Sequence, residues 1–387
     1  MRDGFRILDA DRHVIEPIDL WRKYLPPELA ASAPYMVDIP TTESLPARIH
    51  RLGEKGLLPP LPVPMLAGEP VWHKLTERAR VELAWTSYRR AGQMVAGASP
   101  EAQLEAMDRT GIDAALLYPT FAMYLVGIDG LDPRLAAELA GAYNAWLHDF
   151  CGRDHARLLG VGLISPHDPA GMVAQLDRVA AYGWKVVVLR PNPIQGRTLG
   201  HPAYEPFWAE CERRSIAVAI HEGTHARSPA AGADRFDTRF ALHACSHPME
   251  QMMALLALID GGVLERHPGL RVSFLESGCG WLPYWLWRLD EIEYKSLAYE
   301  VAEHVRRPPS EYFRRQGLVA FEPEEPYLAD VLRHIGEEHL VFGTDFPHLD
   351  HDDRIVDRAL ALRERIPGDA LRKMLWDNAA RFCGLDG

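Results

Sequence analysis

The run Ile216-Ala217-Val218-Ala219-Ile220-His221 consists of apolar residues up to the histidine that ends it. A short, uninterrupted apolar run of this kind is typical of a strand buried on both faces, as in a parallel sheet. Further strand-like runs stand along the chain at Phe5–His13, Ala114–Tyr118, Leu158–Ile164, Lys185–Arg190, Arg271–Glu276, Leu318–Glu322 and Leu340–Asp345. Together these runs predict eight strands.

Stretches with helical periodicity separate most of the predicted strands, namely Pro133–Cys151, Pro169–Tyr182, Ala203–Arg214 and Pro248–Arg266. Strands that alternate with helices predict parallel βαβ units, and eight of them predict a closed α/β barrel, the (β/α)8 TIM-type fold. The structural alternative is an open doubly wound sheet, which usually carries a glycine-rich phosphate loop after its first strand. The corresponding stretch, Asp11-Arg12-His13-Val14, contains no glycine, so we favour the barrel, with residues 1–387 as a single domain.

The tract from about Tyr24 to Pro100 departs from this alternation. It is rich in Pro and Gly, as in Pro59-Pro60-Leu61-Pro62-Val63-Pro64, and it shows no clear period. Because it follows the first strand, it would emerge on the catalytic face of a barrel. We therefore predict an irregular insertion, residues 24–100, that caps the mouth; a peripheral decoration is the alternative.

Composition and charge exclude several classes of protein. Of the 387 residues, 47% are apolar and 25% are charged, and the formal net charge is −12. An acidic chain without a basic cluster is not expected to bind nucleic acid or an anionic membrane. There is no apolar run of membrane-spanning length, no signal-peptide pattern and no paired cysteine motif. These features predict a cytoplasmic protein whose partner is a small-molecule substrate.

Polar residues end several of the predicted strands. The first strand ends in Asp11 and His13, which point the same way because they are two residues apart. The later strand ends are Arg190, His221, Glu276 and Asp345. Strand ends at the C-terminal face of a barrel carry its chemistry, and a combination of His and carboxylate is a common divalent-metal shell. We predict a metal site; a structural polar network is the alternative.

One motif at the fifth strand is misleading. His221-Glu222-Gly223-Thr224-His225 matches HExxH, the pattern of zinc proteases. That chemistry needs both histidines one turn apart on a helix. The apolar run before His221 indicates a strand instead, and Gly223 interrupts the motif. The sequence therefore predicts a strand end at His221 and a loop at His225.

With these features in place, the chain resembles the amidohydrolase superfamily, in particular the amidohydrolase-related (amidohydrolase 2) branch that includes aminocarboxymuconate-semialdehyde decarboxylase and resorcylate-type decarboxylases. The resemblance spans nearly the whole chain. The segments that carry it are Asp9–Pro17, Arg190–Pro193, the His221 strand end, His247–Gln251, Glu276–Trp281 and Phe342–His348.

The resemblance implies a (β/α)8 barrel with a metal at its mouth, held by Asp11, His13, His221 and Asp345. A carboxylate at the first of these positions is known in the family, where His-x-His is frequent. The sixth-strand position departs from the pattern, because the decarboxylases of the branch place a catalytic His where this chain has Glu276.

Two kinds of chemistry are compatible with these residues. In the first, a single Zn²⁺ or Mn²⁺ supports hydrolysis or non-oxidative decarboxylation of an organic acid or carbonyl substrate. Asp345 would then move a proton, Arg190 would hold a substrate anion, and Glu276 would act as a general acid.

In the second, Fe binds the same residues and the protein is a non-heme iron oxygenase, because two His with carboxylates also compose an iron site. Glu276 would then be a ligand, and His247 or His225 a further one, which gives enough donors for two ions. His348 is a candidate support for Asp345. We favour the first chemistry over the second and over a barrel that only binds a ligand. A homodimer is a further expectation.

Overall fold

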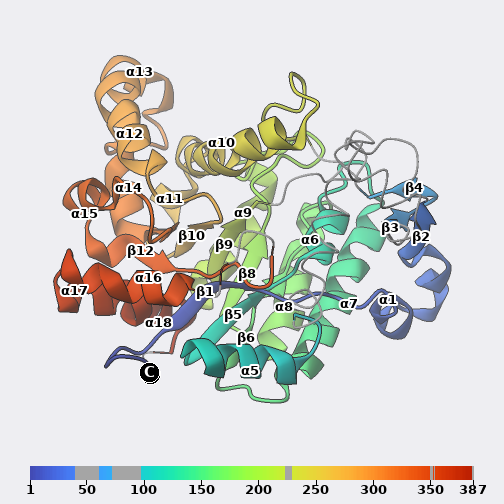
Figure 1. Ribbon diagram of the computed structural model, residues 1–387. Helices are drawn as coiled ribbons and strands as arrows, with labels where there is room; N and C mark the ends of the chain where they lie inside the picture. The colour runs from blue at the N-terminus through green and yellow to red at the C-terminus, as the bar shows by residue number, and fades with distance from the viewer. Residues whose placement is uncertain (40–60, 72–96, 223–228, 349–351, 353, 386–387) are drawn as a thin grey trace.

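The computed structural model describes residues 1–39, 61–71, 97–222, 229–348, 352 and 354–385. Its centre is a barrel of parallel strands surrounded by helices (Figure 1). The barrel strands among these residues are β1 (Leu8–His13), β5 (Ala114–Tyr118), β6 (Leu158–Gly160), β7 (Gly162–Leu163), β8 (Val186–Leu189), β9 (Ala217–His221), β10 (Val272–Leu275), β11 (Gly317–Phe321) and β12 (Leu340–Phe342). All eight predicted strands are present, because β6 and β7 are the two halves of the run predicted at Leu158–Ile164.

Two junctions join the strands into one ring. β1, β5 and β6 pair in that order, and β7 through β12 pair in sequence order. The first junction is Val161, which links β6 to β7 and donates its N–H to Leu117 O at 3.3 Å. At the second, the carbonyl oxygen of Asp11 accepts the N–H groups of Thr344 and Asp345, at 3.2 and 2.8 Å. The prediction of a closed (β/α)8 barrel is therefore confirmed.

Asp9 strengthens the second junction from the first strand. Its fully buried carboxylate accepts the N–H of Thr344 at 2.9 Å and also accepts the Thr344 hydroxyl. The same carboxylate lies 3.4 Å from the Arg12 guanidinium, which is also buried. Because the chain at Thr344 leads directly into Asp345, these bonds fix the two strand ends that carry Asp11 and Asp345.

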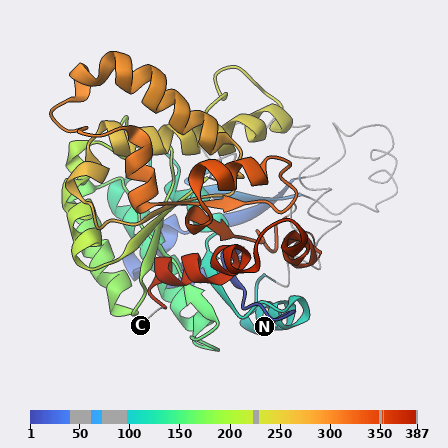
Figure 2. The same ribbon diagram turned by 90° about the vertical axis from the view of Figure 1, so that its left-hand side faces the viewer.

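The helices lie outside the strands. Those described are α1 (Leu20–Tyr24), α5 (Pro100–Thr110), α6 (Phe121–Val126), α7 (Pro133–Cys151), α8 (Met172–Ala181), α9 (Glu205–Arg213), α10 (Arg239–Asp260), α11 (Val263–Arg266), α12 (Trp281–Arg288), α13 (Lys295–Val301), α14 (Pro309–Gln316), α15 (Leu328–Ile335), α16 (Ile355–Ala361), α17 (Gly368–Arg372) and α18 (Asn378–Cys383). Figure 2 shows the orange and red helices of the C-terminal third packed on one side of the barrel. None of the described helices is long and apolar enough to cross a membrane.

Helix ends follow the sequence where capping residues are clear. Asp132 accepts the N–H of Leu135 at 2.9 Å and Pro133 takes the first position, so α7 has the predicted bounds. The prediction for α10 was wrong at its N-terminus. We expected it to begin at Pro248, but it begins nine residues earlier, where the Thr238 hydroxyl caps Ala241 N at 3.3 Å. Pro248 lies inside the helix, and the added turns carry His247 over the strand ends.

The insertion predicted at residues 24–100 is only partly described. Its described residues include an antiparallel sheet of β2 (Tyr35–Ile39), β3 (Leu61–Leu66) and β4 (Glu69–Pro70). In Figure 1 this sheet lies beside α1 and α7. The remaining parts, 40–60 and 72–96, lie outside the described residues, so the capping role stays a prediction.

Candidate active site

Two imidazole rings face each other at the C-terminal ends of β1 and β9. His13 and His221 are fully buried, and their Nε2 atoms lie 3.1 Å apart. Each Nδ1 contacts a backbone carbonyl oxygen, Pro119 O at 3.0 Å for His13 and Glu222 O at 2.7 Å for His221. A carbonyl oxygen only accepts, so each Nδ1 carries the proton. This arrangement leaves both Nε2 atoms available as metal ligands.

Two carboxylates complete the cluster. Asp11 Oδ1 lies 3.0 Å from His221 Nε2 and 3.5 Å from His13 Nε2, and Asp345 Oδ1 lies 3.4 Å from His13 Nε2. Burial alone would raise the pKa of Asp11, but His221 and His13 hold that pKa well below its usual range. The carboxylate of Asp11 is therefore ionised and available as an oxygen ligand.

The cluster requires a positive charge at its centre. Burial lowers the pKa of His13 to about 3, with His348 and His221 adding to the effect, so the His13 ring is neutral. Burial also opposes the charged form of His221, but Asp11 outweighs it and the pKa of His221 is raised. An extra proton on His221 is one way to provide the charge. The residues also fit a divalent cation, which would displace that proton and bind two nitrogens and two carboxylates.

His348 holds Asp345 in place. Its Nδ1 lies 2.7 Å from Asp345 Oδ1 and its Nε2 lies 2.9 Å from the Thr120 hydroxyl. Its ring also contacts the His13 ring, with 4.1 Å between ring centroids and a tilt of 31° between the ring planes. His348 therefore contacts both Asp345 and His13, and its expected support of Asp345 stays a prediction.

Glu276 lies beside these ligands at the end of β10. Its Oε2 lies 3.5 Å from His221 Nδ1 and its Oε1 lies 3.3 Å from His247 Nε2. One oxygen each from Glu276 and Asp345 falls within 4.8 Å of nitrogens of His13 and His348. Glu276 and Asp345 also share a left-handed backbone, with φ of +53° and +50°. Such strain in residues other than glycine is found at functional sites.

Burial and a neighbouring carboxylate act on the protonation of Glu276. In the structure, burial and the negative charge of Asp345 raise the pKa of Glu276 well above its usual range, whereas His221 and His348 act against this rise. A bound cation would also oppose it.

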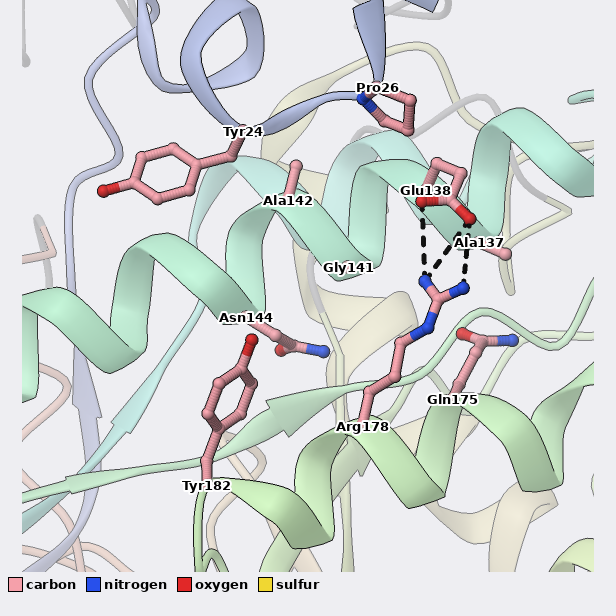
Figure 3. A pocket seen from close by; sticks show the side chains of 10 residues that line it. All are labelled: Tyr24, Pro26, Ala137, Glu138, Gly141, Ala142, Asn144, Gln175, Arg178 and Tyr182. Atoms are coloured by element: carbon pink, nitrogen blue, oxygen red, sulfur yellow. Dashed lines mark hydrogen bonds and ion pairs between the residues drawn. The ribbon is translucent and has the colours of Figure 1, made fainter.

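A cavity of about 360 Å³ opens next to Glu276 and Asp345. Its wall includes His247, from α10, and Glu322, which directly follows β11. We missed Glu322 in the sequence, although it ends a predicted strand and follows the same rule as Glu276. A second cavity of about 200 Å³ lies between α7 and α8, where Arg178 pairs with Glu138 (Figure 3). It lies in the helix layer, and the predicted site residues do not line it.

Arg190 is buried at the end of β8 and bound to protein groups. Its Nη2 donates to Glu222 Oε1 at 3.3 Å and to Asn192 Oδ1 at 2.9 Å. Glu222 is fully buried, so the pair forms an internal salt bridge. The expected contact with a substrate anion stays a prediction, and the alternative that we kept open, a salt bridge to a nearby carboxylate, is present. His225 lies outside the described residues.

The structure thus brings Asp11, His13, His221, Asp345 and Glu276 together at one barrel mouth, with His247 and His348 against them. Their roles as ligands and catalysts stay predictions. A (β/α)8 barrel with this set of metal-binding side chains is typical of one class of proteins, the metal-dependent barrel enzymes. The chain belongs to the amidohydrolase family, whose model matches residues 62–385. It is a metal-dependent enzyme, a hydrolase or carboxy-lyase of that family.

Known proteins similar to this chain include several decarboxylases. The 2-amino-3-carboxymuconate-6-semialdehyde decarboxylase of Dictyostelium discoideum is 25% identical over 74% of this chain and 77% of its own length. The gamma-resorcylate decarboxylase of a Rhizobium species is 25% identical over 74% of this chain and 88% of its own length.

Solved structures share the fold over nearly the full chain. An amidohydrolase from Mycobacterium avium subsp. paratuberculosis superposes with a TM-score of 0.75 at 20% identity, covering 98% of this chain and 99% of that one. The 5-carboxyvanillate decarboxylase of Novosphingobium aromaticivorans, solved with bound manganese, has a TM-score of 0.70 at 19% identity, covering 98% and 97%. These comparisons give no support to the iron-oxygenase alternative.

Proposed function

We propose that this enzyme removes CO₂ without oxidation from a small aromatic or unsaturated carboxylic acid. The observation that carries the proposal is the pair of Nε2 atoms, 3.1 Å apart, beside the Asp11 carboxylate and next to a cavity. The names of the relatives support decarboxylation over hydrolysis.

Asp11, His13, His221 and Asp345 would hold the ion, for which we propose Zn²⁺ or Mn²⁺. When bound, the ion supplies positive charge that binds and orients the substrate carboxylate. The cavity beside Asp345 then receives the rest of the substrate. Asp11, His13 and His221 are buried, both histidines contact backbone carbonyl groups, and Asp345 contacts His348, so the site is preorganised for this task.

The reaction exchanges one C–C bond for one C–H bond. The bond to the carboxylate carbon breaks, its electron pair stays on the substrate carbon, and CO₂ leaves. A proton must then reach that carbon. Glu276 and His247 line the cavity and share a 3.3 Å contact between Oε1 and Nε2, so this pair can hold the proton and deliver it. His247 comes from α10, so an imidazole lies at the site although the residue after β10 is Glu276.

The test is CO₂ release by metal-free and by Mn²⁺- or Zn²⁺-loaded protein on a panel of hydroxybenzoic acids. We expect metal-dependent release of CO₂ without oxygen uptake. Glu276→Gln should keep its metal and lower kcat by about 10² to 10⁴, the usual contribution of general acid catalysis. Glu303→Gln, an exposed residue of the same type, is the matched control. Oxygen consumption, or turnover of an ester or amide with no CO₂ from any acid, would contradict the proposal.

A further inference from the structure

Glu322 is a second glutamate in the cavity wall, one strand away from Glu276. It lines the cavity together with Glu276 and Asp345. β10 and β11 pair in parallel, so the residues that follow them emerge at the same edge of the barrel. Glu322 is therefore in a position to contact a molecule in the cavity.

Glu325 fixes the backbone that carries Glu322. Glu325 Oε1 accepts the N–H of Glu322 at 3.0 Å and the N–H of Cys279 at 2.8 Å, while its Oε2 accepts the N–H of Gly280 at 2.7 Å. One carboxylate thus connects the start of the β11 loop to the loop that follows Glu276. The two glutamates of the cavity are held in a fixed relation, as a substrate-recognition site requires.

The charge of this wall restricts what can bind against it. Glu276, Glu322 and Asp345 are all carboxyl groups, and the negative charges of Glu325 and Asp11 near Glu322 repel a further negative charge. Loss of hydration, with the negative charges of Glu325 and Asp11, raises the pKa of Glu322 to about 7. A further anion placed here would meet the same repulsion, whereas a hydroxyl or amino group would find a hydrogen-bond acceptor.

We propose that Glu322 determines substrate specificity, by accepting a hydrogen bond from a hydroxyl or amino group of the substrate and by disfavouring a second carboxylate there. The inference rests on the proposed function in one respect, namely that one carboxylate of the substrate binds at the metal site. Substrates of the enzyme are then hydroxy- or amino-substituted monoacids, and diacids are poor ligands.

Binding and turnover are measured separately to test this. Dissociation constants of the Mn²⁺-loaded protein are determined by calorimetry for 2-, 3- and 4-hydroxybenzoate and for benzene-1,3-dicarboxylate. The wild-type protein should prefer the best hydroxybenzoate over the diacid. Glu322→Gln should reduce that preference by about ten- to a hundredfold, the range for a hydrogen bond to a charged group. Glu324→Gln, a neighbour that pairs with Arg358 outside the cavity wall, should leave the preference unchanged.

The outcomes separate the two proposals. An unchanged preference in Glu322→Gln, or no binding of any of the four acids to the wild-type protein, would overturn the role of Glu322. CO₂ release is followed in parallel with the same acids. A preference that depends on Glu322 without CO₂ release would support the role of Glu322 and contradict decarboxylation. CO₂ release together with an unchanged preference in Glu322→Gln would support decarboxylation and contradict the role of Glu322.

Discussion

His13 and His221 point their Nε2 atoms at one another across the barrel mouth, 3.1 Å apart, while both Nδ1 atoms contact backbone carbonyl oxygens. The carbonyl contacts fix the tautomer and the orientation of both rings. Two strands far apart in the sequence, β1 and β9, thereby present two nitrogen donors to one point. The neighbouring carboxylates of Asp11 and Asp345 make that point a site for a cation.

His348 is predicted to support metal binding without being required for folding. His348→Ala removes the 2.7 Å contact to Asp345 and the ring that contacts His13. Loss of such a partner of a metal ligand typically lowers metal affinity about 10- to 100-fold. Competition with a chromophoric chelator measures the change. The exposed His334 provides the control variant, His334→Ala. Equal metal affinity in both variants would show that Asp345 does not depend on His348.

Arg190 is predicted to matter for stability. Arg190→Ala leaves the fully buried Glu222 without this partner, and breaking a buried ion pair in this way costs about 3–5 kcal/mol. Urea denaturation of the metal-free protein measures the loss. The double variant Arg190→Ala with Glu222→Ala should regain part of the lost stability, because neither charge of this ion pair is then left buried without the other. If instead stability is unchanged and substrate affinity falls, Arg190 binds the substrate and is not needed to stabilise the buried Glu222.

Glu16 is predicted to stabilise the start of α6. Its buried carboxylate accepts the N–H groups of Thr120, Phe121 and Ala122, at 3.1, 2.9 and 2.9 Å. These are donors at a helix N-terminus that have no partner within the helix. Glu16→Ala should lower the free energy of unfolding by about 2–3 kcal/mol. Glu364→Ala, on the exposed surface, is the control. Equal unfolding midpoints for the two variants would contradict this role.

The barrel was predictable from sequence because its strands are buried on both faces. Runs such as Val186–Leu189 then contain only apolar residues, so a polar residue at the end of a strand is easy to recognise. The same rule located Asp11, His13, His221, Glu276 and Asp345. It also applied to Glu322, which ends the predicted run Leu318–Glu322 and which we overlooked.

Other features depended on tertiary contacts. α10 continues through Pro248 and is held over the strand ends by Gln251, on the C-terminal side of the proline, which donates to Ile220 O and Leu275 O, each at 2.9 Å. Local propensity favours a helix start at that proline, so the nine preceding residues were missed. The contact between His247 and Glu276 is likewise invisible in sequence, because α10 and β10 approach each other only in the folded chain.

Metal content shows whether His13 and His221 hold a divalent ion. Wild-type protein and the variants His13→Ala, His221→Ala and His334→Ala are loaded with Mn²⁺ or Zn²⁺, dialysed and analysed for metal, with circular dichroism as the check on folding. We expect about one divalent ion per chain in the wild type and in His334→Ala, and loss of most of it in the other two, since each removes one of the two nitrogen ligands. Full metal occupancy in a folded His221→Ala protein would contradict this expectation.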